Sequence, residues 1–185
     1  SSYAVSKVYG DYLCRNYYHS YDVKAIVSRA FNHEGAGRGN MFVTSVVTNQ
    51  VKQLEMGLTD KIVIGNVNAF RDWTHVNDIV NGYMKLAQDG QAGDVYNQGS
   101  MRTNSILSYI LLSLERSGKT IENITKYDGQ KKIKDPTETN TDKYYDVSFE
   151  KTKIDSMLLN DELEYTLQDK GIIVNTTDEN IKVER

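Results

Sequence analysis

The chain has 185 residues, 39% hydrophobic and 25% charged, which is enough for a folded domain with a hydrophobic core. Its net charge of −3 indicates no basic surface and so argues against a nucleic-acid partner, and no apolar run reaches the ~20 residues that cross a bilayer. The one cysteine, Cys14, excludes an internal disulfide and indicates a reducing compartment such as the cytoplasm; we expect it to serve packing.

The first predicted element is a helix over residues 3–20, in which Tyr9, Tyr12, Leu13 and Tyr17 recur at helical spacing. Strands and helices then alternate, a rhythm that predicts an α/β fold with a mostly parallel sheet. The strands are expected over 23–31, 60–66 and 94–99, with an extended piece over 70–76, and the helices over 41–57, 77–90 and 103–118.

One of these assignments involves a choice. Residues 41–57 have strand-forming valines and threonines, but the length of the segment and the spacing of its apolar residues favour a helix that ends at Gly57. Asn77 is the expected N-cap of the helix over 77–90. Between the strand 23–31 and the helix 41–57, the residues 32–40 are expected to form a glycine-rich loop.

The last part of the chain interrupts the alternation. Residues 129–146 are polar and charged and are predicted to form a loop, followed by a short helix within 148–160 and a hairpin over 171–184 that turns at residues 178–180. We therefore divide the chain into a main α/β region over 1–126, a polar loop over 127–146 and a C-terminal helix and hairpin over 147–185.

Tyr3 and Lys7 would lie on one face of the first helix, because residues four apart share a helical face. An ammonium beside a phenol favours the phenolate, so such a pair can act as a general base on a sugar hydroxyl while the lysine holds a cofactor ribose. The spacing alone is weak, since about one Tyr-x-x-x-Lys is expected by chance in such a chain. Tyr127 and Lys131 repeat it across an Asp-Gly turn, where the two side chains would not share a face.

Basic side chains in two further segments could bind anions. His33 and Arg38 lie among glycines that let backbone N–H groups approach an anion, although a plain surface turn is the alternative. Arg71 could bind a diphosphate through paired N–H groups, or else form a salt bridge to Asp72. His75 is expected to be a structural hydrogen-bonding residue. The spacing of His, Cys and carboxylate residues predicts no metal site.

Four segments in order resemble the extended short-chain dehydrogenase/reductases, and GDP-mannose 4,6-dehydratases in particular. They are "SSYAVSKVYGDYL", "SRAFNHEGAGRGNMFVT", "GLTDKIVIGNVNAFRDWTHVNDIV" and "GDVYNQGS", and the resemblance covers residues 1 to about 118. The family usually has proline in place of Ser2 and Ala36, and the tail after about residue 126 is dissimilar. The resemblance implies a set of roles: Tyr3 as the base, Lys7 on the cofactor ribose, His33 and Arg38 on NADP, Asn32 near the diphosphate of the sugar nucleotide, and Arg71 on that diphosphate or nucleotide.

The resemblance implies the C-terminal half of a Rossmann-like, doubly wound parallel sheet with a small substrate-binding α/β region. In the family, the half before Tyr3 supplies the glycine-rich phosphate turn, the residue that selects NAD or NADP, a Ser/Thr and the glutamate that takes the C5 proton. We therefore expect a truncated gene product or an incompletely recorded chain with an exposed apolar sheet edge, weak NADP binding and no turnover alone.

The implied activity is the conversion of GDP-mannose to its 4-keto-6-deoxy product, with NADP, or else NAD, as transient hydride acceptor. A cytoplasmic homodimer or homotetramer without nucleic-acid or membrane partners is implied as well. Two alternatives remain open. One is a related sugar-nucleotide epimerase or reductase, and the other is a non-catalytic binding or oligomerisation remnant.

Overall fold

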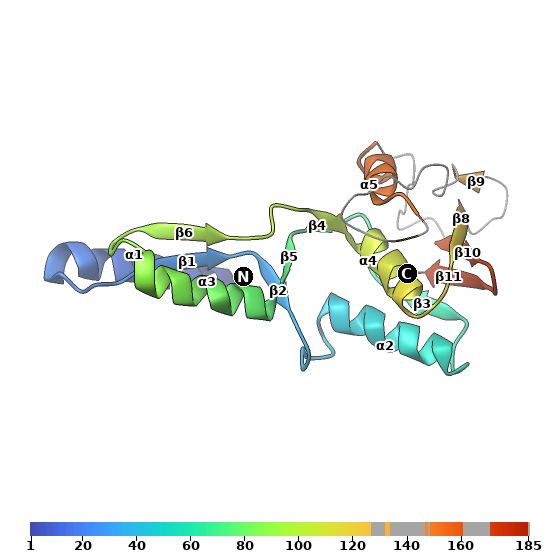
Figure 1. Cartoon of the computed structure of the whole chain (residues 1–185), viewed down its shortest axis with the longest axis horizontal. Helices are drawn as coiled ribbons and strands as arrows, with labels where there is room; N and C mark the ends of the chain where they lie inside the picture. Colours follow the sequence, from blue (N-terminus) through green and yellow to red (C-terminus); the bar gives the residue numbers. More distant parts are fainter. Residues whose placement is uncertain (127–131, 134–146, 148, 161–170, 185) are drawn as a thin grey trace. The chain divides into compact units, whose positions relative to one another are not determined.

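The computed structural model describes residues 1–126, 132–133, 147, 149–160 and 171–184 (Figure 1). The chain divides into two compact units, and each unit is built from two separate stretches of sequence. Unit 1 comprises Ser1–Gly37 and Asp72–Thr103, and unit 2 comprises Arg38–Arg71 and Asn104–Arg185.

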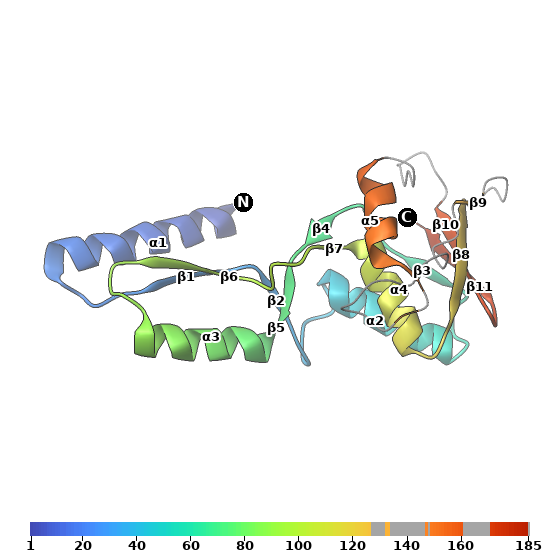
Figure 2. The ribbon, with the colours of Figure 1, turned by 45° about the horizontal axis from the view of Figure 1, so that its top comes forward.

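Unit 1 is a three-layer arrangement around a pair of parallel strands. Strands β1 and β6 pair in parallel with Val27 opposite Val95, and β2 pairs in parallel with β5. Helices α1 and α3 lie on opposite faces of the β1–β6 pair (Figure 2). The elements are α1 (Ser2–Tyr21), β1 (Val27–Ala30), β2 (Asn32–Glu34), β5 (Trp73–His75), α3 (Val76–Asp89) and β6 (Val95–Gln98).

The ends of α1 follow from its sequence, although its packing within unit 1 is sparse. The Ser1 hydroxyl caps the first turn by accepting from the Ala4 N–H, and Asp22 ends the helix in the left-handed conformation. Within residues 2–21, all of them described, none is buried. Near the end of α1, the Tyr18 ring packs against Gly93. A Cβ at position 93 would lie 2.3 Å from this ring, and φ there is +89°, so only glycine fits.

Unit 2 is a mixed five-stranded sheet with helices. The strand order is β3-β11-β10-β8-β9, in which only the β3–β11 pair is parallel, and a separate antiparallel pair joins β4 to β7. The elements are α2 (Val43–Glu55), β3 (Lys61–Val63), β4 (Phe70–Arg71), β7 (Asn104–Ser105), α4 (Ile106–Arg116), β8 (Ile121–Lys126), β9 (Lys132–Ile133), α5 (Lys151–Leu159), β10 (Ile172–Thr176) and β11 (Asn180–Glu184).

Helix α4 forms the centre of the core of unit 2. Its apolar residues recur every three or four positions and point inward, which is the pattern of a buried amphipathic helix. Alternate residues of β10 and β11 are buried as well, which is typical of strands with one face against a core. The fully buried α4 side chains, each with 0% exposure, are Leu107, Ile110, Leu111 and Leu114.

The structure confirms the predicted helices near the N-terminus and around residues 41–57, 77–90 and 103–118, and it confirms the α/β class. The short helix within 148–160 is present as α5, and the hairpin over 171–184 as β10 and β11. In the part of the chain that the structure describes, no helix is long and apolar enough to cross a membrane.

Three expectations are corrected. The cap of α3 is His75, whose Nδ1 accepts from the Asn77 N–H at 3.2 Å, so Asn77 lies inside the helix. Asn32–Glu34, expected in a loop, form β2 because they pair with β5. The larger sheet is mixed because the C-terminal hairpin inserts between β3 and β8. The predicted loop over 129–146 lies outside the described residues except for β9.

Candidate functional site

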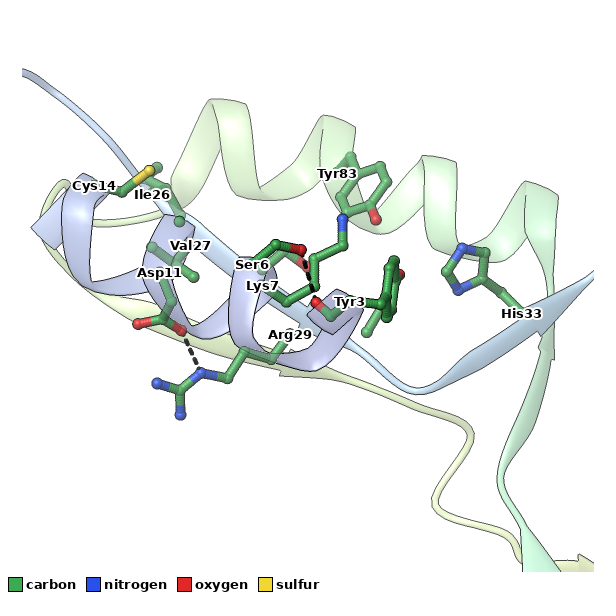
Figure 3. A pocket seen from close by; sticks show the side chains of 13 residues that line it. Tyr3, Ser6, Lys7, Asp11, Cys14, Ile26, Val27, Arg29, His33 and Tyr83 are labelled. Carbon is green, nitrogen blue, oxygen red and sulfur yellow. Dashed lines mark hydrogen bonds and ion pairs between the residues drawn. The ribbon is translucent and has the colours of Figure 1, made fainter. Parts of the chain in front are cut away.

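A pocket of about 720 Å³ lies in unit 1, and three of the predicted site residues line it. Tyr3 and Lys7 face it from α1, and His33 faces it from β2 (Figure 3). The lining positions of α1 recur at intervals of three and four, so a single helical stripe faces the pocket: Tyr3, Ser6, Lys7, Gly10, Asp11 and Cys14.

Tyr3 and Lys7 lie on the same side of α1, as their spacing predicts. The Lys7 Nζ is 5.4 Å from the centroid of the Tyr3 ring. Figure 3 shows the lysine directed toward Tyr83 of α3, which lines the pocket from the opposite side. The Tyr3 side chain is 70% exposed. A phenol and an ammonium group are thus both open to a ligand that enters the pocket.

The pocket follows one edge of β1. Five consecutive residues, 26–30, line it, and consecutive residues of a strand can all meet a pocket only along the strand's edge. Val27 and Phe31 donate their N–H groups toward β6, so the backbone groups of Ser28 and Ala30 point to the pocket side. Within the described part of unit 1, no strand pairs with this edge.

An ion pair attaches α1 to β1 beside the pocket. Arg29 Nε donates to Asp11 Oδ2 at 2.6 Å, and Arg15 Nη1 lies 3.8 Å from Asp11 Oδ1. The Asp11 side chain is only 10% exposed. The hydrogen bond from Arg29 outweighs the opposing effect of burial and holds the pKa of Asp11 below its ordinary value. This contact fixes the helix that carries Tyr3 and Lys7 against the strand.

Replacing Arg29 with methionine is expected to raise the pKa of Asp11 toward its ordinary value. Because the folded-state pKa is depressed, the stabilisation that the pair provides is complete above the unfolded-state pKa of about 3.9 and is lost as the pH falls through the folded value. An NMR titration of the Asp11 carboxyl carbon measures the change. Arg15→Met is the matched control with a smaller expected rise, and equal rises in the two variants would contradict the dominance of Arg29.

The two predicted residues of β2 have different roles in the structure. His33 Nδ1 lies 3.0 Å from the Phe31 carbonyl oxygen, which orients the ring at the pocket. Asn32 is exposed and pairs with Trp73 in the parallel β2–β5 ladder. Gly35 follows β2, and a Cβ there would lie 2.6 Å from the Val76 side chain, so glycine lets the chain pass close to α3.

The predicted residues Arg38 and Arg71 belong to unit 2, whereas the pocket described above lies in unit 1. The Arg38 guanidinium stacks on the Phe42 ring, with its central carbon 3.6 Å from the ring centroid. Arg71 Nη1 donates to the Phe70 carbonyl at 2.7 Å, and its backbone pairs with Asn104.

Asp72, the alternative partner considered for Arg71, binds the loop after β6. Its carboxylate accepts from the Ser100 N–H at 3.0 Å, the Ser100 hydroxyl at 2.7 Å and the Met101 N–H at 3.1 Å. These three hydrogen bonds hold Met101 in the left-handed conformation, with φ of 59° and a side chain that is 98% exposed. The aspartate of the Arg-Asp-Trp segment is therefore a loop-binding residue.

Sequence reasoning missed two residues at the pocket and placed a third wrongly. Asp11 could have been found, because it follows Lys7 by four positions on the same face. Tyr83 could not, because only the tertiary fold brings α3 to the pocket. Cys14 was expected to serve packing, but it is exposed and lines the pocket. Among the described residues, no three His, Cys, Asp or Glu side chains are grouped to hold a metal ion.

Comparison with known proteins defines the family. The family profile described as GDP-mannose 4,6 dehydratase matches residues 1–169. The chain belongs to this family. The GDP-mannose 4,6-dehydratase of Yersinia enterocolitica is 35% identical over 123 residues, which are 66% of this chain and 32% of that protein. The GDP-mannose 4,6-dehydratase of Sinorhizobium fredii is 33% identical over 122 residues, which are 66% of this chain and 34% of that protein. The chain thus spans about a third of the length of these curated relatives of the dehydratase family.

Solved structures show the same fold. The RMD of Pseudomonas aeruginosa, solved with NADPH, has 32% sequence identity and a TM-score of 0.57, and the match covers 60% of this chain and 39% of that one. The dTDP-glucose 4,6-dehydratase of Bacillus anthracis, solved with NAD, has 26% identity and a TM-score of 0.57, with coverages of 65% and 37%. The Rossmann-like fold expected for this member of the dehydratase family is therefore confirmed.

Proposed function

We propose that this chain carries the Tyr–Lys pair and part of the cofactor and substrate sites of a GDP-mannose 4,6-dehydratase. The observation that supports the proposal most directly is the placement of Tyr3, Lys7 and His33 around one pocket. Chance spacing would not bring a histidine from β2 to the same pocket as a Tyr–Lys pair on α1. Membership of the dehydratase family supplies the reaction class.

The residues at the pocket fit a nicotinamide dinucleotide, with NADP as our proposal and NAD as the alternative. Lys7 presents an ammonium suited to ribose hydroxyls, and His33 presents a ring edge suited to a polar group of the cofactor. Two structural relatives also hold a nicotinamide dinucleotide: the Pseudomonas structure contains NADPH, and the Bacillus structure contains NAD. The cofactor would accept a hydride from C4 of the hexose and return it to C6.

The protein's own part is proton transfer and orientation. Tyr3 would act as a phenolate, which the Lys7 charge stabilises, and would take the proton of the 4-hydroxyl as the C4–H bond breaks. Loss of water across C5 and C6 then leaves a 4-keto-5,6-ene, and the return of the hydride to C6 with a proton to C5 gives the 4-keto-6-deoxy sugar nucleotide. Arg71 would bind the diphosphate as a two-pronged donor, and Asn32 would contact the same region. Arg38 would act on the cofactor.

Ligand binding to the chain tests these assignments directly. Uniformly labelled protein is titrated with NADP⁺ and, separately, with GDP, and amide shifts are followed by NMR. We expect NADP⁺ to shift the signals of Tyr3, Lys7 and His33, and GDP to shift those around Arg71. Shifts that are absent at millimolar ligand, or spread evenly over the surface, would contradict the site and favour a non-catalytic remnant.

One relative favours a second reaction class. The GDP-6-deoxy-D-mannose reductase of Pseudomonas aeruginosa is 32% identical over 111 residues. A reductase would use the same Tyr–Lys pair to donate a proton to a keto group. Net consumption of NADPH with a 4-keto-6-deoxy sugar nucleotide would support the reductase, whereas dehydration of GDP-mannose without net cofactor use supports the dehydratase.

We also propose that α1 pairs with α1 of a second copy in a homodimer or homotetramer. Opposite its pocket stripe, α1 exposes Val5, Val8, Tyr9 and Tyr12, each more than half exposed, at intervals of three and four residues. A continuous apolar stripe of this kind marks an association surface, and like pairs with like across a two-fold axis. Light scattering of the purified chain measures its mass in solution.

A further inference from the structure

Unit 2 contains a buried polar cluster that the proposed reaction does not use. Ser105 and Ser108 at the start of α4 are fully buried, and Lys151 of α5 is 8% exposed. Both serine hydroxyls donate to the same oxygen of Asp155, Ser105 at 2.8 Å and Ser108 at 2.7 Å. The other carboxylate oxygen pairs with Lys151, one turn earlier on α5. The cluster thus joins α5 to the first turn of α4.

The same first turn of α4 holds the segment that leads to Arg71. The Ile106 N–H donates to the Ala69 carbonyl at 3.1 Å, and the Leu107 N–H donates to the Val67 carbonyl at 3.2 Å. In the β4–β7 pair, Phe70 lies opposite Ser105 and Arg71 opposite Asn104. Ser105 therefore contacts Asp155 through its side chain and belongs to the strand pair of Arg71 through its backbone.

The cluster of Ser105, Ser108, Lys151 and Asp155 is better suited to fixing the relative position of α4 and α5 than to stabilising the fold. A carboxylate beside a helix N-terminus is favourable, and the two hydroxyls and the ammonium satisfy it. Buried ion pairs, however, are often no more stabilising than apolar residues of the same volume, because both charges lose water. Such a cluster does fix one relative position of the two helices, since each hydrogen bond requires a particular distance and direction.

We propose that Asp155 is a positioning residue for Arg71. Through Ser105 and Ser108 its carboxylate fixes the first turn of α4, and that turn fixes residues 67–71, so that the guanidinium is presented to the diphosphate of a nucleotide. This inference rests on the proposed role of Arg71. It adds a residue of α5, which makes no ligand contact of its own in the proposal.

The test is a double-mutant cycle on GDP binding. Ser108→Ala removes one hydroxyl donor but leaves the Ser105 cap and the Lys151–Asp155 pair intact, so the protein stays folded. We expect this variant to raise the GDP Kd about tenfold, the loss typical of one hydrogen bond to a charged group. In an Arg71→Ala background the same substitution should change the Kd little, because the two residues act through one path.

A matched control is Ser113→Ala, which removes a hydroxyl from the same helix. Ser113 donates to the Tyr109 carbonyl of its own helix and not to α5, so GDP affinity should not change. Hydrogen exchange gives a readout without ligand: the Ile106 and Leu107 amides should exchange faster in Ser108→Ala than in Ser113→Ala. Asp155→Asn, provided that it folds, should affect both measurements at least as strongly.

The possible results distinguish the positioning role of Asp155 from the proposed diphosphate-binding role of Arg71. If Arg71→Ala weakens GDP binding but Ser108→Ala does not, the positioning role is overturned and the role of Arg71 stands. If Ser108→Ala weakens binding equally with and without Arg71, Asp155 does not act through that residue and the proposal is again overturned. If Arg71→Ala leaves GDP binding unchanged, the proposed function of Arg71 fails, and the positioning role fails with it.

Discussion

Replacing Tyr3 with phenylalanine is expected to lower the rate of GDP-mannose dehydration by about 10²–10⁴-fold, the usual contribution of a positioned general base. Phenylalanine keeps the ring that packs beside Lys7 but has no hydroxyl to exchange the proton of the 4-hydroxyl group. The fold should be unaffected, because the side chain is 70% exposed. The loss should appear in kcat more than in KM, since the phenol acts in the transition state.

Turnover is measured in a hybrid enzyme, because the chain spans about a third of the length of its curated relatives. In the hybrid, the Yersinia enterocolitica relative supplies the part of its length that lies outside the match. Tyr9→Phe is the matched control, because Tyr9 lies on the same helix but outside the pocket stripe. If Tyr3→Phe retained the activity of the Tyr9→Phe variant, Tyr3 would not be the base.

Leu111→Ala in the middle of α4 is expected to lower the free energy of unfolding by about 3–5 kcal/mol. Leu111 is fully buried, and its removal leaves a cavity in the core between α4 and its neighbours. Because a typical domain is stable by only about 5–15 kcal/mol, this loss would unfold a large share of unit 2 under mild denaturant. Urea unfolding followed by far-UV circular dichroism measures it.

The adjacent residue provides the comparison. Leu112 is half-buried on the same helix and lines a surface groove, so Leu112→Ala removes the same atoms from a more open site. We expect a loss of about 1 kcal/mol there, near the typical value for a single substitution. Equal losses at Leu111 and Leu112 would show that α4 is not packed as the structure has it.

Helices α2, α3 and α4 are predictable from sequence because each has a regular apolar period and a glycine at or just past its end. The strand β2 is not, since Asn32, His33 and Glu34 have no strand propensity and form a strand only by pairing with β5. The hairpin of β10 and β11 can be predicted from the alternation of apolar and polar residues along its strands. Its insertion between β3 and β8 depends on tertiary packing, which no local pattern reveals. The division of the chain at residues 126 and 146 stays a prediction.

Local sequence patterns also identify only part of the candidate site. Tyr3 and Lys7 share a helical face for local reasons, and the structure places His33 at their pocket. Local spacing also identifies Asp11, because this residue follows Lys7 by four positions and lies on the same face of the helix. Tyr83 lies far along the sequence, and only the packing of α3 brings it near, so no local pattern identifies it.

The division of each unit between two distant stretches of sequence has a consequence for how the protein folds. Strand β1 can pair only after β6 has formed, because Val27 pairs with Val95 across a stretch that includes Arg38–Arg71 of the other unit. Long-range parallel pairing of this kind is slow, since the closure of a long loop precedes the contacts that stabilise it. The helix with Tyr3 and Lys7 precedes β6 in the sequence, so its supporting strand pair forms only after β6 is in place. During that interval its exposed tyrosines and valines are open to wrong partners, which makes synthesis and refolding the stages at which this protein is most prone to aggregate.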